Sequence, residues 1–347
     1  MNPLLRAYRA TGADQPGGDP LLAHGVAMEG YFWRFTDVAR ARSVIALIGV
    51  NQGPRGPWAT LGLAAWPGSH LAIAAREGAY ADPVRVHAAS GDAFDGDDRR
   101  VLVDLGPDAR LDVRLHDLVR WPRRRWGGSS IFHSVPALNQ YWHPWLLGGR
   151  ATGTVSMDGE TWSLDGAQVY AEKNWGKEGF PEAWWWGQAQ GFEEPAACVA
   201  FAGGLVHAGP LRTTVTALVV RLPDGHVLRL GDPVVSPVET HVTDTTWTLR
   251  GRGFGWRVRV DAYAPLADAH VLPVPLPSRH RNTAGALEHL GGALSIRVER
   301  RGRLVWQGDT TLAGLEHGGL DRAEDELRRR AVASGATGAP PAKQSDR

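Results

Sequence analysis

Tyr170-Ala-Glu-Lys-Asn-Trp-Gly-Lys-Glu-Gly-Phe-Pro-Glu-Ala-Trp-Trp-Trp-Gly-Gln-Ala-Gln190 is the stretch of this 347-residue chain that departs most from the composition around it. The chain has three lysines and thirty-five arginines, yet two of the lysines and four of the fifteen tryptophans lie within this stretch. Large rigid aromatic side chains beside titratable groups suit a site that binds an apolar ligand and transfers protons. The stretch therefore indicates both a pocket and its chemistry.

The same residues can alternate as a β-strand does. In an extended segment alternate side chains share a face, so the even-numbered residues from 168 to 174 would line one side and the odd-numbered residues the other. One face would then carry an acid, a phenol and amides, which would also suit an ordinary exterior strand. The sets expected to share a face are Gln168, Tyr170, Glu172 and Asn174; Val169, Ala171 and Lys173; Trp184, Trp186, Gln188 and Gln190; and, if that run is extended, Tyr141, His143 and Trp145.

Strand signals separated by Gly, Pro and Asp-Gly run from about residue 42 to 312 and predict an antiparallel all-β protein. Asp158-Gly159 and Asp224-Gly225 stand where two-residue hairpin turns are expected. Strand repetition of this kind gives sandwiches or barrels, which the pattern does not separate. The clearest strand candidates are Ser43–Val50, Ala59–Ala65, Arg100–Asp104, Thr213–Val220, Trp256–Asp261 and Leu294–Glu299.

A helix is predicted only near the C-terminus, where Leu320, Leu327 and Ala331 form an apolar stripe within residues 320–333. Residues 334–347 are rich in Gly, Ala, Pro and Ser and are expected to form a disordered tail. Residues 9–20 are rich in Gly, Asp and Pro and are expected to be a loose lead-in.

Composition excludes several classes of function. The net charge is +1 with acidic and basic residues scattered, so nothing indicates a surface for nucleic acid. A single cysteine, Cys198, excludes an internal disulfide, and its apolar neighbours indicate a small buried side chain. No apolar run is long enough for a signal peptide or a transmembrane helix, so a soluble, cytoplasmic protein is expected. The sequence also lacks motifs for a nucleophilic serine, a dinucleotide, a phosphate loop or a metal-binding histidine pair.

A second unusual run lies upstream, His133-Ser-Val-Pro-Ala-Leu-Asn-Gln-Tyr-Trp-His-Pro-Trp-Leu-Leu-Gly-Gly149. Together with residues 170–190 it resembles the tocopherol cyclase family, in which a His-Ser-Val-Pro…Trp-His-Pro segment precedes Tyr-Ala-Glu-Lys-Asn-Trp-Gly, Phe-Pro and a tryptophan cluster. The resemblance is strong from Ser134 to Gln190 and thinner at Glu29–Trp33 and Gly314–Gly319.

This resemblance implies a fold. Tocopherol cyclases look related to carotenoid 1,2-hydratases and to lipocalin-like pericyclases, which are built from two consecutive β-barrel domains. We therefore expect two antiparallel lipocalin-like β-barrel domains with a short C-terminal helix. The N-terminal barrel is placed at residues 1–180, the C-terminal barrel at 181–322, and the end of the helix with the tail at 323–347. A ligand site where the two domains meet would fit the usual location of pockets.

Glu172 is the leading candidate for a catalytic acid. A carboxyl group buried against tryptophans loses the hydration of its charged form, so its pKa rises and it can stay protonated near neutral pH. Such a group could protonate an alkene. The alternative is a surface glutamate paired with Lys173 or Lys177.

The resemblance to the carotenoid hydratases sharpens this choice, because their functional residues fall in a His-x-Trp pair followed at a fixed interval by a Tyr-x-Asp pair. Here His143-Pro-Trp145 precedes Tyr170-Ala-Glu172 at the same interval of 25 residues, with Glu in place of Asp. His143 could then pass a proton to Glu172 or deprotonate the attacking hydroxyl, and Tyr170 could polarise either group. A single histidine is usually structural, and His133 is a weaker second candidate.

The remaining candidates would bind the substrate. The face of a tryptophan stabilises developing positive charge on a tertiary carbon by about 0.5–2 kcal/mol per contact, and a tryptophan wall excludes competing water. An ordinary aromatic core is the alternative, and the two asparagines in the set would equally suit turns. The expected binding set is Trp145, Tyr141, Lys173, Asn174, Trp175, Trp184, Trp186 and Asn139. Neither a cofactor nor a metal is expected.

Three hypotheses follow for the function. The first is a cofactor-free cyclase that protonates the first side-chain double bond of a prenylated hydroquinone, after which the phenolic oxygen closes a chromanol ring. The second is an isoprenoid hydratase or a pericyclase of a bacterial natural-product pathway. The third is a lipocalin-like carrier that binds a lipophilic molecule unchanged. A cavity faced by both Glu172 and His143 would favour an enzyme over a carrier.

The expected partner is in each case a lipophilic small molecule, such as a prenylated quinol or an isoprenoid. Transient contact with a membrane surface is expected as well. The sequence leaves the oligomeric state open.

Overall fold

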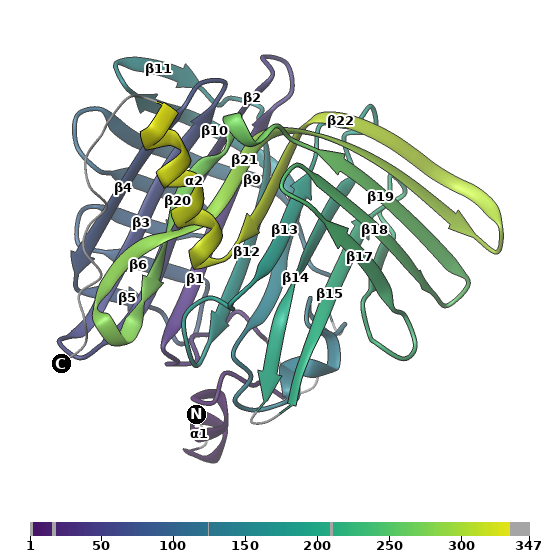
Figure 1. The fold of residues 1–347 in the computed structure, drawn as a ribbon, viewed down its shortest axis with the longest axis horizontal. Helices are drawn as coiled ribbons and strands as arrows, with labels where there is room; N and C mark the ends of the chain where they lie inside the picture. The colour runs from purple at the N-terminus through teal and green to yellow at the C-terminus, as the bar shows by residue number, and fades with distance from the viewer. Residues whose placement is uncertain (1–2, 16–18, 124, 209–210, 334–347) are drawn as a thin grey trace.

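The protein is an antiparallel all-β protein with two large sheets and a C-terminal helix, as predicted (Figure 1). The structure, a computed structural model, describes residues 3–15, 19–123, 125–208 and 211–333. The predicted tail at 334–347 lies outside the described residues.

The first twelve strands form one sheet. Its bounds are β1 Met28–Asp37, β2 Arg42–Gly53, β3 Gly56–Trp66, β4 His70–Glu77, β5 Ala79–Ala81, β6 His87–Ser90, β7 Phe94–Asp97, β8 Arg100–Asp104, β9 Ala109–Arg120, β10 Tyr141–Met157, β11 Glu160–Ser163 and β12 Gln168–Gly176. The order is β4-β3-β2-β1-β12-β10-β9-β8-β7-β6-β5, with β11 paired to β10. The edge strands β4 and β5 are consecutive in the chain with Gly78 between them, so the sheet curls into a nearly closed barrel. Alternate side chains fill its interior, as in β9, where buried and exposed residues alternate from Ala109 to His116.

The remaining ten strands form the second sheet. They are β13 Trp184–Ala189, β14 Cys198–Ala208, β15 Leu211–Arg221, β16 Val227–Leu230, β17 Val238–Val242, β18 Thr246–Gly253, β19 Trp256–Tyr263, β20 His270–Leu276, β21 Arg281–Arg300 and β22 Arg303–Gly318. Their order is β16-β15-β14-β13-β22-β21-β19-β18-β17, with β20 paired to β21. This barrel-like sheet encloses its own apolar core, which includes Phe201, Trp247 and Trp306.

The two sheets pack side by side, and two apolar clusters lie between them (Figure 1). One cluster joins Tyr170 of β12 to Trp186 of β13, and the other joins Ile45 of β2 to Trp184 and Leu272. Strand β12 is therefore buried on both faces, at eight of its nine residues. The chain passes from the first sheet to the second between β12 and β13, and the division into two domains near residue 180 stays a prediction.

Two α-helices occur among the described residues, α1 Pro3–Arg9 and α2 Leu320–Ala333, with short 3-10 helices η1 Ser130–Ser134, η2 Leu266–Asp268 and η3 Pro277–Arg279. Helix α2 has the predicted bounds and packs on β21, but its buried residues are Ala323 and Glu326, whereas Leu320 and Leu327 of the predicted apolar stripe are exposed. Helix α1 was not predicted, because seven residues are too few to show a helical period.

Each predicted strand lies within an observed one. Asp158 and Gly159 both have positive φ, 51° and 81°, and form the predicted two-residue turn between β10 and β11. Asp224-Gly225 instead belongs to a three-residue loop, because Leu222 N still bonds His226 O at 2.8 Å.

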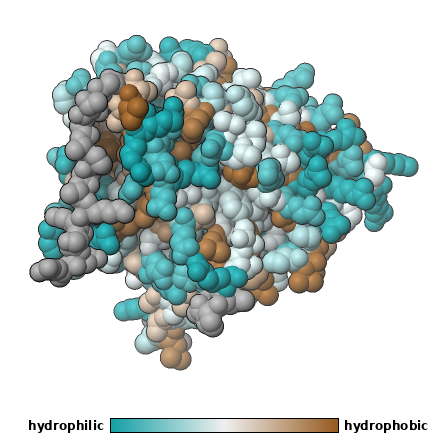
Figure 2. Space-filling view, viewed as in Figure 1, coloured by the Kyte–Doolittle hydropathy of each residue, from teal (hydrophilic) through white to brown (hydrophobic). Residues whose placement is uncertain are grey.

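None of the described helices has the length and apolar character needed to cross a membrane. On the face drawn in Figure 2, hydrophobic side chains are scattered among hydrophilic ones. The expected contact with a membrane surface stays a prediction.

Candidate active site

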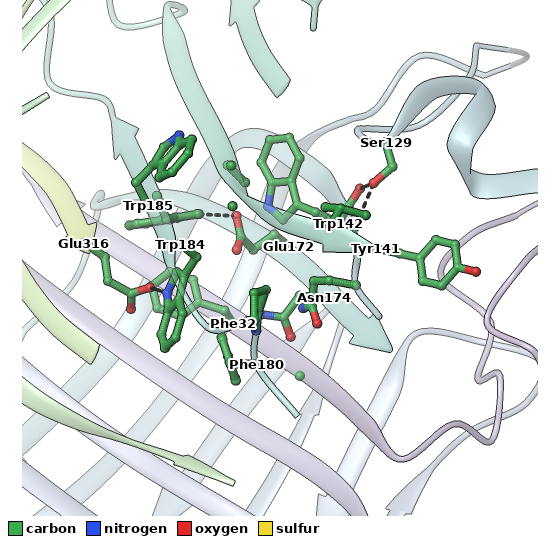
Figure 3. Close-up of a pocket in the computed structure, with 18 of the residues that line it drawn as sticks. Phe32, Ser129, Tyr141, Trp142, Glu172, Asn174, Phe180, Trp184, Trp185 and Glu316 are labelled. Atoms are coloured by element: carbon green, nitrogen blue, oxygen red, sulfur yellow. Dashed lines mark hydrogen bonds between the residues drawn. The ribbon is translucent and has the colours of Figure 1, made fainter. Parts of the chain in front are cut away.

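A cavity of about 420 Å³ lies between the two barrels, and its wall is mostly apolar and aromatic. This volume is in the usual range for small-molecule sites. Strands β1, β2, β10 and β12 of the first sheet and β13, β14, β15, β20, β21 and β22 of the second contribute side chains to it. Glu172, Asn174, Trp184 and Glu316 gather around it in Figure 3.

Glu172 projects from β12 into the cavity, because the even-numbered side chains of this strand face the second sheet while the odd-numbered ones face the core of the first barrel. The Tyr170 hydroxyl donates a hydrogen bond to Glu172 Oε2 at 2.5 Å, and Trp186 Nε1 donates to the same oxygen at 2.8 Å. Burial raises the pKa of Glu172 to about 7, and the side chains of Tyr170, Trp186 and Trp142 act in the opposite direction. Because Oε2 accepts both bonds, the proton of the neutral acid belongs on Oε1.

The two even-numbered tryptophans of β13 face the cavity together and each binds a carboxyl group. Trp186 bonds Glu172 as described, and Trp184 Nε1 donates to Glu316 Oε1. Trp185 also lines the cavity, with its indole N–H bonded to Thr216 Oγ1 at 3.1 Å. The tryptophan run therefore supplies aromatic wall and orients two acids.

Asn174 offers a polar contact in this wall. Its Oδ1 atom has no hydrogen-bond partner among the described residues and lines the cavity side of β12. Gly30 on β1 makes room for the amide, because a Cβ there would lie 2.1 Å from Asn174 Oδ1. A ligand hydroxyl is a suitable donor for this oxygen.

Glu288 of β21 and Glu316 of β22 also line the cavity, and the sequence analysis did not identify either. They are direct cross-strand partners in the antiparallel register. Burial raises the pKa of Glu316 to about 7, and burial with the neighbouring Glu316 raises that of Glu288 well above its usual range. The signal that could have shown them is an acid inside a mostly apolar strand segment, as in Ala286–Leu290, where His289 is the only other polar residue.

His143 and Trp145 do not line the cavity, so the structure does not bring His143 to the cavity beside Glu172, and a catalytic role for His143 stays a prediction. His143 is the cross-strand partner of Lys173, so it lies on the face of β12 opposite Glu172. Between His143 and Leu146 the register shifts by a β-bulge, which turns the following residues inward. Trp145 packs in the core of the first barrel at 1% exposure, and its expected contact with a ligand tail stays a prediction.

The surroundings of His143 are those of a structural histidine. Its Nδ1 atom accepts the backbone N–H of Gly128 at 3.1 Å, and its ring packs edge-on against Trp121. Burial, then the nearby His133 and Lys173, hold the pKa of His143 well below its usual range, so the ring is neutral.

Replacing His143 with phenylalanine should therefore cost stability and leave turnover unchanged. The ring is kept, but the buried Gly128 N–H loses its acceptor, which costs about 1–3 kcal/mol. Chemical denaturation and a steady-state assay of the same preparation measure the two effects. A tenfold fall in kcat with unchanged stability would return His143 to the catalytic set.

Three further sequence candidates lie at or near the cavity edge. Tyr170 does not line the cavity, but its hydroxyl group donates the hydrogen bond that orients Glu172. Tyr141 contributes to the wall, yet its ring points away from Glu172 in Figure 3 and its hydroxyl already donates to Val135 O at 2.6 Å. Asn139 is outside the cavity wall and bonds backbone atoms of β14, and its expected contact with a quinol oxygen stays a prediction.

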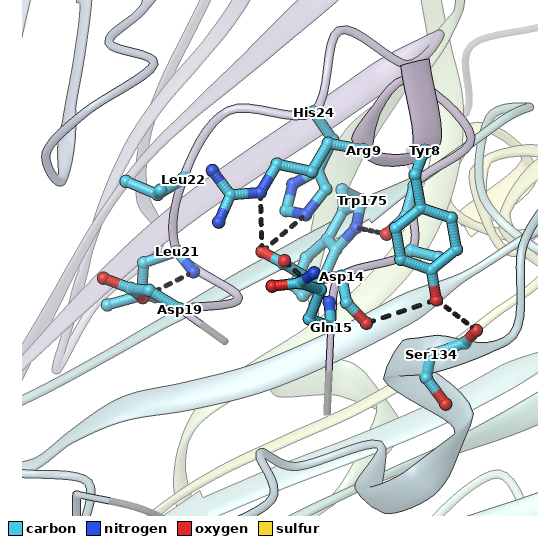
Figure 4. Close-up of polar contacts among 12 residues, drawn as sticks. Tyr8, Arg9, Asp14, Gln15, Asp19, Leu21, Leu22, His24, Ser134 and Trp175 are labelled. Carbon is cyan, nitrogen blue, oxygen red and sulfur yellow. Dashed lines mark hydrogen bonds and ion pairs between the residues drawn. The ribbon is translucent and has the colours of Figure 1, made fainter. Parts of the chain in front are cut away.

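Lys173 and Trp175 point to the opposite side of β12 from Glu172 and do not line the cavity, and their expected contact with a ligand stays a prediction. Lys173 is fully buried, with Nζ 2.7 Å from Glu29 Oε2. The Trp175 indole donates to Gly12 O at 2.7 Å and stacks on the ring of His24 (Figure 4). These residues bind the N-terminal segment to the first barrel.

The arrangement can hold and move protons within an apolar space. Three carboxyl groups face the cavity, those of Glu172, Glu288 and Glu316. Within the described ranges no group of three or more His, Cys, Asp and Glu side chains is placed to hold a metal ion. That neither a cofactor nor a metal takes part stays a prediction.

Comparison with known proteins finds relatives for both the sequence and the fold. A family model described as tocopherol cyclase-like matches residues 104–319, more than half of the chain. A probable chloroplastic tocopherol cyclase of Oryza sativa subsp. japonica is 40% identical over 74 residues, which are 21% of this chain and 16% of the rice protein.

Two solved structures share the fold. Kievitone hydratase from Nectria haematococca has a TM-score of 0.52 at 11% identity, covering 84% of this chain and 88% of that chain. CghA with Sch210972 has a TM-score of 0.55 at 14% identity, covering 85% and 89%. At these identities the two structures bear on the fold alone.

Proposed function

The chain belongs to the tocopherol cyclase-like family, and from this premise we propose that it is an enzyme that closes a chromanol ring in a prenylated hydroquinone. The observation that carries the proposal is the Glu172 carboxyl group. This group lies in a mostly apolar cavity, and burial raises its pKa to about 7. A carboxyl group with this pKa is half protonated near neutral pH, and a mostly apolar cavity holds little water that could accept its proton.

In the proposed reaction Glu172 Oε1 donates its proton to the less substituted carbon of the first side-chain double bond. Positive charge then develops on the tertiary carbon, and the phenolic oxygen bonds to that carbon and loses its own proton. One C=C π bond and one O–H bond break while one C–H and one C–O bond form, so the reaction involves no redox change. The hydrogen bonds from Tyr170 and Trp186 to Oε2 stabilise the carboxylate as it forms.

The aromatic wall supports the same step. Phe32, Trp142, Trp184 and Trp185 all line the cavity, and an aromatic face over a developing cation contributes about 0.5–2 kcal/mol. Asn174 Oδ1 is available to accept a ring hydroxyl, which would orient the quinol. A tail folded along the apolar wall would hold oxygen and carbon in reactive geometry.

Of the two residues expected to face the cavity of an enzyme, Glu172 and His143, only Glu172 does so. The carrier hypothesis nevertheless explains less of the cavity. A lipophilic ligand needs apolar walls, whereas three carboxyl groups around the cavity each cost desolvation free energy that binding does not require. Hydration of an isoprenoid would use the same acid with water as nucleophile. The two enzymatic reactions give different products and are separated by the assay.

The test is incubation of the purified protein with prenylated hydroquinones of graded tail length and with isoprenoid polyenes, followed by product analysis. We expect a chromanol that has the same mass as its quinol. A product heavier by one water would show a hydratase, and unchanged substrates that bind tightly would show a carrier.

A further inference from the structure

The carboxyl pair formed by Glu288 and Glu316 lines the cavity from the second sheet, whereas Glu172 lines it from β12 of the first sheet. Because the two residues are register partners on neighbouring strands, their side chains lie on one face with Cβ atoms about 5 Å apart. Both line the cavity. Two carboxylates at this separation repel each other strongly, so the pair holds one proton between its members rather than none.

An unpartnered atom in this pair points to a ligand. Glu288 is 1% exposed, and its Oε1 atom has no hydrogen-bond partner in the part of the chain that the structure describes. Glu316 is partly exposed to the cavity, and the Trp184 indole N–H fixes its Oε1 atom. Buried polar atoms are normally paired, so a buried carboxyl oxygen beside the cavity needs either the proton that Glu288 shares with Glu316 or a donor from a bound molecule.

A buried cation accounts for the charge of the pair. The Arg34 side chain is fully buried on β1, donating to Gln188 Oε1 at 3.0 Å and to Leu290 O at 2.9 Å. Burial lowers the pKa of Arg34 to about 10, so it keeps its charge near neutral pH, and that charge opposes the rise in the pKa of Glu288. One positive charge among three carboxyl groups is balanced when two of them are protonated.

We propose that the Glu288–Glu316 pair is a second catalytic group of this cavity, which carries one proton and accepts another from the attacking hydroxyl of the substrate. The proposal rests on the cyclase function and supplies the base that Glu172 does not provide. Glu288 keeps the shared proton and donates it in a hydrogen bond to Glu316, and Glu316 faces the cavity as the acceptor.

The step is balanced between two walls of the cavity. Glu172 loses a proton to the alkene carbon, and Glu316 gains the proton that the phenolic oxygen releases as the C–O bond forms. After product release Glu316 gives up its proton and Glu172 takes one up, both by exchange with water. Burial raises both pKa values to about 7, so the acid and the base are present together in their working forms near neutral pH.

The pH dependence of kcat tests this proposal with Glu316→Gln. Wild type should give a bell-shaped profile, because turnover needs Glu316 ionised and Glu172 protonated. Glu316→Gln should lower kcat by about 100-fold or more and remove the fall on the acid side. Glu316→Asp should have a lower kcat than wild type but should still lose activity at acidic pH, since the carboxylate remains but is withdrawn by one methylene.

The matched control is Glu194→Gln. Glu194 also accepts an indole N–H, from Trp306 at 3.0 Å, but it lies outside the cavity wall. It should leave both the rate and the profile unchanged. A Glu316→Gln profile that keeps its acid limb, or a kcat within a few-fold of the control, would overturn the proposal.

A second measurement is independent of turnover. The infrared band of protonated carboxyl groups is followed through a pH titration. In wild type it should contain two components that titrate near neutral pH. One of them should be missing in Glu316→Gln and the other in Glu172→Gln. Identical titrations in wild type and Glu316→Gln would overturn the one-proton pair. Wild-type protein could show both infrared components and yet cyclise no quinol. That result would exclude the cyclase function and the role of Glu316 as base, but it would leave the shared proton of the pair in place.

Discussion

Replacing Glu172 with glutamine is expected to lower turnover by about 100-fold to 10,000-fold and to leave ligand affinity nearly unchanged. Glutamine keeps the shape of the side chain and can still accept the hydrogen bonds from Tyr170 and Trp186 through its oxygen. It lacks a transferable proton. Single-turnover kinetics and equilibrium binding of the quinol separate the two effects.

The control for this variant is again Glu194→Gln, which removes a carboxyl group that accepts an indole N–H away from the cavity. Turnover of Glu172→Gln equal to that of the control would exclude Glu172 as the acid. A loss of binding in proportion to the loss of rate would show that Glu172 holds the substrate and does not protonate it.

The same variant should change how stability depends on pH. Because the folded-state pKa of Glu172 is raised, the stability that the neutral acid contributes is present below its unfolded-state pKa and is lost as the pH rises through about 7. Glu172→Gln has no proton to lose, so above that pH it should gain about 3 kcal/mol relative to wild type. Denaturation curves at acidic and alkaline pH measure the gain, and a constant difference between the two proteins would contradict a raised pKa.

Replacing Arg34 with methionine should destabilise the protein by about 3–5 kcal/mol, because it leaves a buried anion without its cation. Arg34 Nη1 donates to Thr36 Oγ1 at 2.7 Å, and Nη2 donates to Leu290 O and to Leu312 O at 2.9 and 2.7 Å. These bonds join β1 of the first barrel to the strands that carry Glu288 and Glu316. Equilibrium chemical denaturation at neutral pH measures the loss.

Arg259→Met is the matched control for this second variant. Arg259 also lies on a strand and bonds Asp261 at 2.6 Å, but its side chain is 56% exposed, so its removal should change stability little. The cost of Arg34→Met should shrink at acidic pH, where the carboxyl pair takes a second proton and needs no cation. An equal loss of unfolding free energy in the two variants would show that Arg34 does not balance the charge of a buried carboxylate.

Local sequence patterns predicted much of the fold. Alternation predicted strands such as Arg100–Asp104 with their observed bounds, and the apolar stripe predicted the helix from Leu320 to Ala333. Asp158-Gly159 predicted a hairpin because its backbone conformation is one that few other dipeptides adopt. These features depend on neighbours in sequence, which a pattern records directly.

The candidate site was predicted only in part, for reasons of geometry. Glu172 was recognisable because rare residue types surround it, and alternation correctly placed Lys173 on the other face. The position of His143 away from the cavity could not be predicted, because the spacing between motifs carries no information on register, which β10 and β12 fix by pairing His143 with Lys173. Glu288 and Glu316 were missed because only the folded second sheet brings them to the cavity.

Cyclisation in deuterium oxide measures the central claim, that a carboxyl proton of this cavity enters the substrate carbon. The quinol is incubated with the protein in D₂O, where the buried carboxyl groups exchange, and the chromanol is analysed by mass spectrometry and NMR. We predict one deuterium per molecule, on the carbon next to the newly oxygenated one, and loss of this product with Glu172→Gln. A chromanol without deuterium, or one formed equally by Glu172→Gln, would contradict the account.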